Sequence, residues 1–310
     1  MLKVRRTRAL VGSFAVAAAA VTCALPASAA TSPTPTPTAT ATGTPPVATS
    51  PVPAASSTAV TASPTASPTP SPTVTKPFTT AKPAAKSAPR IIWVSKHTIS
   101  VDGRYLINPD GFHETMTLEN VGYGNAFTVA TKTPNKGHVL AFPDFLFGCS
   151  WGVCSPHRTL PVQVKHDGDP GGSVSTAGHP KGMYNAAYDI WLELKPYLGG
   201  QPHGAEIMIW LRETPGIGST RGAPKVRIDG ALYWLIHWRA HNVNGSWNYV
   251  QFRKVSQTNE LRGIHINDFI RVAEAHHLAS PNWYLQNITA GFEIWNGGQG
   301  LQMSNFWARG

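Results

Sequence analysis

Three acidic residues stand in segments that otherwise read as buried strands. Glu206 begins the run Glu-Ile-Met-Ile-Trp-Leu, Glu293 lies within Gly-Phe-Glu-Ile-Trp, and Asp189 lies within Tyr-Asp-Ile-Trp-Leu. A carboxylate among large apolar side chains is costly to bury unless it has a partner or a function. Two carboxyl groups held close together can cleave a glycosidic bond, one as nucleophile and the other as acid and base. We therefore treat these three acids as candidate catalytic groups.

The neighbours of the two glutamates indicate what they act on. In an extended strand Met208 and Trp210 share a face with Glu206, while the aliphatic residues between them face the opposite side. The same alternation sets Trp295 beside Glu293. Any one of these acids alone is explained if its strand has a solvated outer face. A tryptophan near each of the two glutamates favours a binding surface instead. Flat aromatic rings match the apolar faces of sugars, so we expect a sugar polymer as ligand.

Two cysteines follow the N-terminal segment, Cys149 and Cys154, five positions apart with a glycine between them. In an exported chain this spacing favours a disulfide-closed loop over zinc, which would need a second pair of ligands nearby. Trp151 inside the loop is either a sugar platform or a packed loop anchor. The twelve histidines show no metal-binding spacing. We expect no metal and no cofactor.

A second tryptophan pair has an undecided orientation. Trp234 and Trp238 alternate with Tyr233 and His237. One of these pairs therefore faces the binding surface, and the other faces the core or the solvent. The sequence does not say which pair does which.

The segments that position these residues read mostly as short strands. Residues 226–230 and 249–255 alternate apolar and polar side chains, which is typical of half-buried strands. Turn residues at 169–172 and 244–245 predict hairpins.

One late segment predicts a helix instead of a strand. Asn267 is its expected cap, and the helix runs through Phe269 and Leu278 to a stop at Ser280-Pro281. An all-β domain with one late helix predicts a two-sheet jelly-roll sandwich with a concave substrate cleft. The chain shows no repeat of 20 to 50 residues, which argues against a propeller or solenoid.

The N-terminal part divides into two segments before the domain. Residues 1–30 have a basic start, an apolar run and small residues at the end, which predicts a secretory signal peptide. An uncleaved anchor is the alternative. Residues 31–90 are rich in Thr, Pro, Ser and Ala, which predicts a disordered linker. Residues 91–310 form the predicted catalytic domain. We expect a secreted protein with no membrane span in the mature chain, tethered to the cell surface if the signal stays attached.

The net charge of +10 invites a nucleic-acid partner, but its distribution excludes one. Eight of the 26 basic residues lie before residue 91, and all 16 acidic residues lie after it, so the domain carries 18 − 16 = +2. A nearly neutral domain lacks the basic patch that phosphate binding needs.

Three stretches together carry a family resemblance: 184–191, 206–210, and 291–295 with the glycines that follow it. Their types and spacing resemble glycoside hydrolase family 12, over roughly residues 140–310. The resemblance implies that Glu206 is the nucleophile and Glu293 the general acid and base. It also implies that Asp189 is a hydrogen-bonding neighbour that tunes Glu206. The implied activity is retaining endo-β-1,4-glucanase or xyloglucanase hydrolysis of soluble β-glucans, by a chain that we expect to be a monomer.

One region departs from the family pattern. Members of this family commonly have an early Asn-x-x-Trp strand, whereas residues 105–112 contain neither tryptophan nor cysteine. This puts the glycon subsites in doubt, and we expect no activity on crystalline cellulose. Two other classes compete with an enzyme: a non-catalytic carbohydrate-binding jelly roll, and a structural wall protein on a long stalk.

Overall fold

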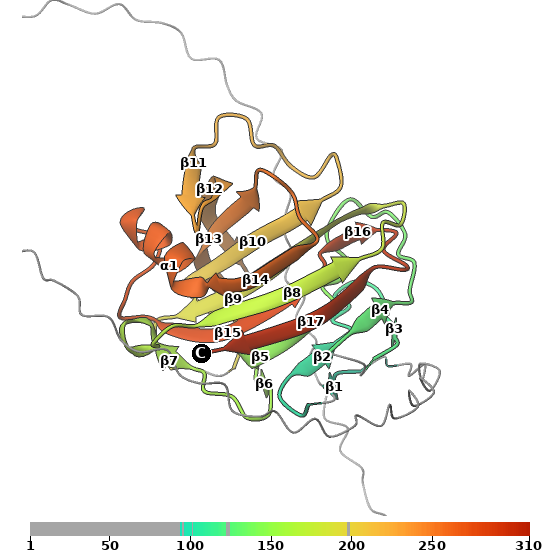
Figure 1. Cartoon of the computed structure of the whole chain (residues 1–310), viewed down its shortest axis with the longest axis horizontal. Helices are drawn as coiled ribbons and strands as arrows, with labels where there is room; N and C mark the ends of the chain where they lie inside the picture. Colours follow the sequence, from blue (N-terminus) through green and yellow to red (C-terminus); the bar gives the residue numbers. More distant parts are fainter. Residues whose placement is uncertain (1–93, 95, 101, 122–124, 197–198) are drawn as a thin grey trace, which may run out of the picture. The chain divides into compact units, whose positions relative to one another are not determined.

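The computed structural model describes residues 94–310, apart from 95, 101, 122–124 and 197–198. The predicted signal peptide and linker, residues 1–90, lie outside the described residues. The described part consists of two β-sheets packed face to face and one α-helix (Figure 1). It is a jelly-roll sandwich, as the sequence predicted.

The larger sheet carries the candidate site. Neighbouring strands in it run antiparallel except β10 and β13, which are parallel. Its main path, in spatial order, is β1 (Thr98–Ile99), β2 (Leu106–Asn108), β5 (Asp144–Ser150), β15 (Tyr284–Gly291), β9 (Met183–Glu193), β10 (Ala205–Glu213), β13 (Gly245–Lys254), β12 (Ala231–Asn242) and β11 (Lys225–Ile228). Three short strands lie off this path: β6 (Val153–Cys154), β7 (Val162–Gln163) and β16 (Ile294–Asn296).

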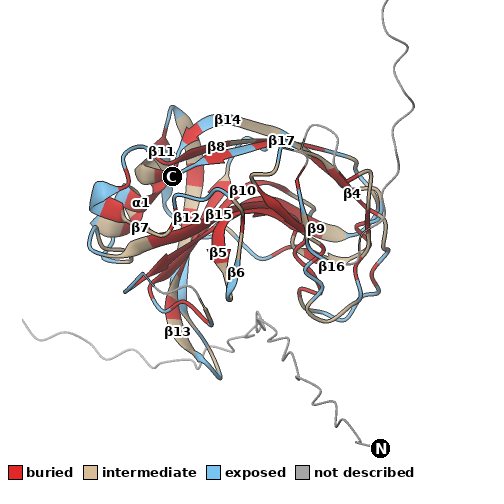
Figure 2. Cartoon of the chain, turned by 90° about the horizontal axis from the view of Figure 1, so that it is seen from below, coloured by how far each residue is buried: buried red, intermediate tan, exposed pale blue. Residues whose placement is uncertain are grey.

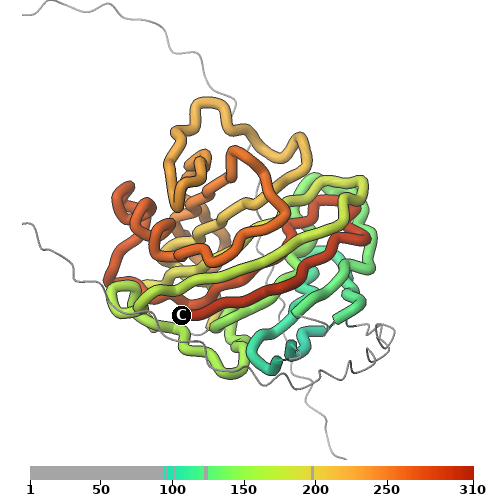
Figure 3. The backbone as a smooth tube through the Cα atoms, in the orientation of Figure 1, coloured from blue at the N-terminus to red at the C-terminus, as the bar shows by residue number. Residues whose placement is uncertain are grey.

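The smaller sheet covers one face of the larger one. Its strands, in spatial order, are β14 (Glu260–His265), β8 (Gly171–Ala177), β17 (Gln302–Arg309), β4 (Phe127–Val129) and β3 (Leu118–Glu119). A short 3-10 helix, Val164–His166, precedes β8. Figure 3 follows the chain from β10 through β11 and β12 back to β13, a path that brings β13 beside β10 in the parallel direction.

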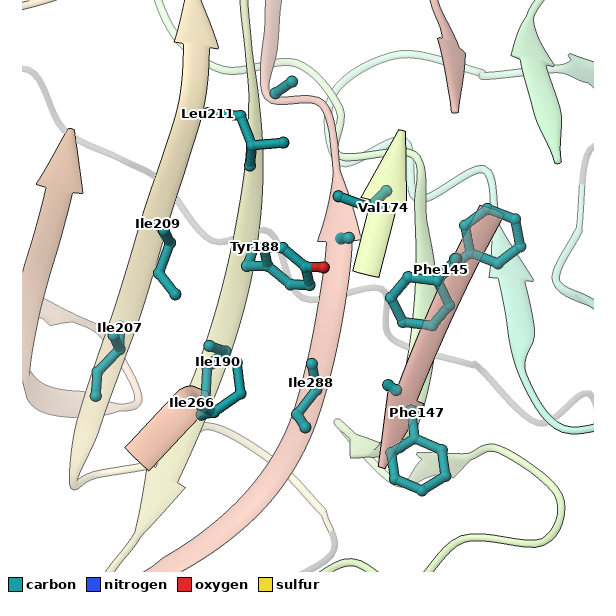
Figure 4. Close-up of a cluster of buried hydrophobic side chains, with 14 of the residues drawn as sticks. Phe145, Phe147, Val174, Tyr188, Ile190, Ile207, Ile209, Leu211, Ile266 and Ile288 are labelled. Carbon is teal, nitrogen blue, oxygen red and sulfur yellow. The ribbon is translucent and has the colours of Figure 1, made fainter. Parts of the chain in front are cut away.

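The main core lies between the sheets. Alternate residues of β9 and β10, such as Tyr188, Ile190, Ile207 and Ile209, all point into it and are fully buried (Figure 4). Each of these isoleucines contributes about 1.5–3 kcal/mol when removed from water. The core therefore fixes the parity of these strands, and so determines which residues face outward.

The other face of the larger sheet, which we call the open face, carries a second apolar cluster. Its buried members are Phe142, Ala187, Met208, Trp210, Ile217 and Tyr249. In Figure 2 the larger sheet arches between β13 and β16, and the open face lies on the inner side of the arch. The larger sheet is therefore curved, with the open face on the inner side of the curve.

The predicted helix exists, but its predicted ends are wrong. Helix α1 spans Ile266–Ala275 because β14 runs directly into it and leaves His265 at the N-cap. Asn267 lies inside the first turn, where its Nδ2 donates to Asp167 Oδ1 at 2.9 Å. The helix stops before Leu278 because His277 takes a left-handed conformation (φ 59°) and the Leu278 N–H bonds the Ala273 carbonyl, a Schellman ending.

The predicted turns had different outcomes. Residues 244–245 do close a hairpin, with Asn242 paired to Gly245 between β12 and β13. Residues 169–172 do not, because they lead from the 3-10 helix into β8, whose sheet partners are β14 and β17. The strand expected at 226–230 ends at Ile228, and Asp229-Gly230 form the turn into β12 with positive φ at both residues.

Candidate active site

Glu206 stands on the open face near the start of β10. In the sheet register it is opposite Trp191 of β9 on one side and Tyr249 of β13 on the other. Met208 and Trp210 share its face, since the aliphatic residues between them belong to the main core. Met208 is in turn opposite Asp189. The structure thus places four residues of the predicted site on two adjacent strands of one surface.

Glu293 reaches the open face by a different route from the predicted one. The stretch 291–295 is not one strand, because β15 ends at Gly291 and β16 begins at Ile294. Asn185 of β9 holds the linking segment: its Oδ1 accepts the Glu293 N–H at 3.1 Å, and its own N–H bonds the Glu293 carbonyl at 3.0 Å. Phe292 and Ile294 enter the main core, as predicted, so Glu293 faces away from it.

Each of the three acids accepts a hydrogen bond from a side-chain N–H. The Trp247 indole Nε1 donates to Glu206 Oε2 at 2.6 Å, and the Trp191 Nε1 donates to Asp189 Oδ2 at 2.9 Å. Asn185 Nδ2 donates to Glu293 Oε2. An N–H donor stabilises the ionised form of a carboxyl and fixes its orientation.

The two indole donors form one aromatic group. The rings of Trp191 and Trp247 lie 5.6 Å apart, and the ring of Trp151 meets Trp191 edge to face at 5.1 Å. Trp191 and Trp247 are almost fully buried, at 1% and 3% exposed. Trp151 is half-buried and packs against the residue that holds Asp189, which is how a loop anchor behaves. The indole group is a rigid support beneath two of the acids.

Burial, and to a lesser extent the charges of neighbouring acids, raise the pKa values of the three acids. Burial raises the pKa of Glu206 well above its usual range, and the charge of Asp189 adds to this, while the Trp247 bond opposes it. Burial raises the pKa of Glu293 to about 8, against the lowering effect of the Asn185 bond. Burial also raises the pKa of Asp189 to about 7. The group therefore holds fewer than three negative charges at neutral pH.

Asp189 does not contact Glu206 in the way that the resemblance implies. No hydrogen bond joins these two described side chains, and Asp189 instead accepts its bond from Trp191. Its second oxygen, Oδ1, is buried and has no hydrogen-bond partner among the described residues. Asp189 acts on Glu206 through charge, and it retains an acceptor for a ligand or a proton.

Further acids lie toward the β2 edge of the open face, and sequence reasoning missed them. Asp144 of β5 is 4% exposed and is paired in register with Asn108 and Gly291. Burial, and then the charge of Asp110, raise its pKa well above the usual range. The alternation Asp-Phe-Leu-Phe at residues 144–147 carries the same signal that marked Glu206. Asp110 is exposed to solvent, and its charge acts on Asp144.

The region that departs from the family pattern contributes an aromatic residue. Phe112, the last residue of the stretch 105–112, packs against the open-face cluster. Trp295 packs against the same cluster and meets the Trp210 ring at 6.4 Å. The Trp210 Nε1 is buried and lacks a hydrogen-bond partner among the described residues. Phe112 and Trp295 are only partly buried, so their rings present a flat apolar surface of the kind that stacks on a sugar.

Other features of the described residues bear on the sequence predictions. A disulfide joins Cys149 to Cys154, as predicted, across the pairing of β5 and β6. Within the described ranges, no group of three or more His, Cys, Asp or Glu side chains is arranged to hold a metal ion. The helices in this part of the chain are too short to cross a membrane.

Paired carboxyls on an aromatic, concave sheet of a jelly roll define a glycoside hydrolase. The family model described as "Glycosyl hydrolase family 12" matches residues 114–309. The chain belongs to this family, and the recognition made from its sequence is confirmed.

Individual relatives agree with this assignment. Endoglucanase S from Pectobacterium parmentieri is 28% identical over 172 residues, which cover 53% of this chain and 64% of that protein. The chain thus spans just under two thirds of that relative. The probable cellulase Cel12b from Mycobacterium tuberculosis is 29% identical over 131 residues, 41% of this chain and 82% of that protein. Among solved structures, endoglucanase cel12A from Rhodothermus marinus superposes with a TM-score of 0.64 at 29% identity, covering 70% of this chain and 98% of that one.

Proposed function

We propose that the protein is a secreted, retaining endo-β-1,4-glucanase that cleaves soluble β-glucans by double displacement. The observation that carries this proposal is the placement of Glu206 and Glu293 on one aromatic face, where the charges of Asp189 and Glu293 raise the pKa of Glu206 and the charge of Asp189 raises the pKa of Glu293. Membership of the glycosyl hydrolase family supports it.

In the first step Glu206 attacks the anomeric carbon as a carboxylate. The glycosidic bond breaks as Glu293 gives its proton to the departing oxygen, and a covalent glycosyl ester forms on Glu206. In the second step Glu293, now ionised, takes a proton from water, and the water oxygen attacks the anomeric carbon. The ester bond breaks, so that Glu206 leaves as a carboxylate and Glu293 is again protonated.

The surroundings of the two glutamates support this division of roles. Glu206 accepts an indole N–H at 2.6 Å, a donor that favours the ionised form needed for attack. Glu293 has a pKa raised to about 8, which keeps it protonated near neutral pH and suits a general acid. Asp189 is the third acid of the site. Its charge raises the pKa of Glu206, so protonation of Asp189 would lower that pKa and favour the Glu206 carboxylate. Because burial raises the pKa of both glutamates, these shifts alone do not divide the roles, and the family resemblance assigns Glu206 as the nucleophile.

The expected substrates are internal bonds of soluble β-glucans: cellulose derivatives, mixed-linkage glucan or xyloglucan. An open sheet face can bind a polysaccharide along its length, which suits cleavage of the internal bonds of that polysaccharide. Met208, Trp210 and Trp295 would contact the bound sugars, and Trp151 would support the site from the disulfide loop. We further propose export by residues 1–30 and a monomeric state, since a polymer-cleaving open face needs no second subunit.

Two variants test the mechanism. Glu206→Gln and Glu293→Gln keep the shape of each side chain but remove its ionisable group, so each should abolish reducing-sugar release without lowering the melting temperature. Proton NMR of the first product should show the β-anomer before mutarotation, because two displacements retain configuration. An initial α-anomer would show inversion and contradict the double displacement.

A non-catalytic carbohydrate-binding protein is the alternative. It would bind soluble mixed-linkage glucan saturably but release no reducing ends. Binding that is equal in the parent chain and in Glu206→Gln, with no turnover in either, would favour this alternative.

A further inference from the structure

Trp238 is the most exposed tryptophan on the open face. The structure resolves the orientation that the sequence left undecided, because Tyr233 points into the core and packs edge to face on Phe269 at 5.3 Å. Trp234 and Trp238, at the opposite parity of β12, therefore face outward with Glu206. Trp238 is 48% exposed, more than any other tryptophan of the described residues.

Trp234 and Trp238 differ in what covers them. Strand β11 pairs with β12 only as far as Trp234, and Lys225 of β11 lies over the Trp234 ring at 4.3 Å. Beyond that point β12 is the edge of the sheet, and no cation lies over Trp238 among the described residues. The exposed indole surface of Trp238 is therefore free for a ligand.

The Trp238 ring has a firm support on its protein side. It stacks on Tyr249 with ring centroids 3.9 Å apart and an angle of 26°. Tyr249 is only 8% exposed. Its hydroxyl is held by two hydrogen bonds: it donates to Met208 Sδ at 3.1 Å and accepts from Gln251 Nε2 at 3.0 Å. An aromatic ring held in this way keeps its orientation and loses little entropy when a ligand stacks on it.

The register relates Trp238 directly to the reacting group. Trp238 is opposite Tyr249, and Tyr249 is opposite Glu206, so the three residues form one row across the strands. Neighbouring strands lie about 4.8 Å apart, so Trp238 is about 10 Å from Glu206 across the sheet. One strand spacing is close to the advance per sugar of an extended β-1,4-glucan. A glucan lying across the strands would place a sugar near Trp238 about two units from the bond that is cleaved.

We propose that Trp238 is a sugar-binding platform at the β12 rim of the open face, which stacks on a glucosyl unit about two positions from the cleaved bond. By fixing the position of the bound glucan on the open face, Trp238 would determine which glycosidic bonds are cleaved. The inference rests on the proposed function for its ligand class, a β-1,4-linked glucan, but it concerns binding and not the chemical step.

The test compares Trp238→Ala with Trp307→Ala in the full chain. Trp307 is a matched control, since it is 37% exposed but lies on β17 of the other sheet. In a Glu206→Gln background, titration with cellohexaose should show about a 5- to 10-fold loss of affinity for Trp238→Ala and none for Trp307→Ala. Trp238→Phe keeps a smaller ring and should lose less.

A second measurement uses the active chain. Wild type and Trp238→Ala are given cellohexaose, and the early products are separated by length. The platform fixes the position of the oligosaccharide, so Trp238→Ala should change the product ratio, while Trp307→Ala keeps it. Unchanged affinity together with an unchanged product ratio in Trp238→Ala would overturn the proposal. If the wild type cuts nothing but the affinity loss appears, the platform stands and the catalytic proposal fails.

Discussion

The indole of Trp247 offers a direct way to change the state of Glu206 without touching the carboxyl itself. Trp247→Phe keeps an aromatic ring in the buried position and removes the N–H that bonds Glu206 Oε2 at 2.6 Å. The contact with Trp191 at 5.6 Å is partly retained by the smaller ring. The main chemical change is the loss of one donor to one carboxylate.

The size of the effect follows from the kind of bond that is lost. A hydrogen bond to a charged group contributes about 1.5–3 kcal/mol, and about 1.4 kcal/mol corresponds to a tenfold change. Both groups are buried, with Glu206 only 8% exposed, so solvent screening does not reduce this much. The bond lowers the pKa of Glu206, so its removal raises that pKa further. On the acid side of the pH profile, kcat/KM should fall by about 10- to 100-fold.

The assay is kcat/KM on soluble mixed-linkage glucan, measured from acidic to alkaline pH. Because Glu206 must be ionised to attack, the acidic limb of Trp247→Phe should move to higher pH, and the deficit should shrink as pH rises. Trp191→Phe is the matched control, since it removes the donor to Asp189 and leaves the Glu206 bond in place. A Trp247→Phe profile with the wild-type acidic limb would refute the idea that this indole keeps Glu206 ionised, even if the activity fell.

Two further predictions follow from other hydrogen bonds and from buried charge. Asn185→Ala removes the side-chain hydrogen-bond donor to Glu293. That bond lowers the pKa of Glu293, so in the variant the alkaline limb of kcat/KM should move to higher pH. An unmoved limb with reduced kcat would show that Asn185 only supports the backbone. Asp144→Asn removes an acid whose pKa is raised by burial in the folded state. The folded wild type therefore binds more protons than the unfolded chain, so its free energy of unfolding falls as the pH rises above the pKa that Asp144 has in the unfolded chain. The variant should therefore melt at a higher temperature than wild type at about pH 8 and show little gain at about pH 4; a gain independent of pH would count against this reasoning.

Local alternation was enough to predict the part of the site that lies on regular strands. Ile207 and Ile209 on one side, with Glu206 and Met208 on the other, form a pattern with a period of two that needs no knowledge of the partner strands. The disulfide and the two-sheet class were predictable for the same reason, because short-range spacing and composition determine them.

The route taken by Glu293 was not predictable from its own neighbours. Gly-Phe-Glu-Ile-Trp alternates like a strand, yet the ladder breaks at Gly291 and Asn185 holds the next residues. Asn185 lies 108 positions away, and nothing near Glu293 in the sequence points to it. Trp247 and Trp191 were missed for the same reason: they act on the acids through pairings between strands.

The helix ends show a different limit. Asn267 is a good capping residue by type, but β14 continues to His265 and sets the N-cap of α1 two residues earlier. The tertiary path of the chain decided between two acceptable caps. Trp238 is similar, because its alternation with His237 was readable, but its face was decided by the packing of Tyr233 and its exposure by where β11 ends.

The central claim is that Glu206 forms a covalent bond to the sugar. A 2-deoxy-2-fluoro cello-oligosaccharide with a good leaving group slows the second step and should accumulate the glycosyl ester. Mass spectrometry of the intact chain should show the added mass of one fluorinated oligosaccharide without its leaving group, and peptide mapping should place it on Glu206. Labelling of Glu293 or Asp189 instead, or turnover of the reagent with no adduct and with inversion at the anomeric carbon, would contradict the account.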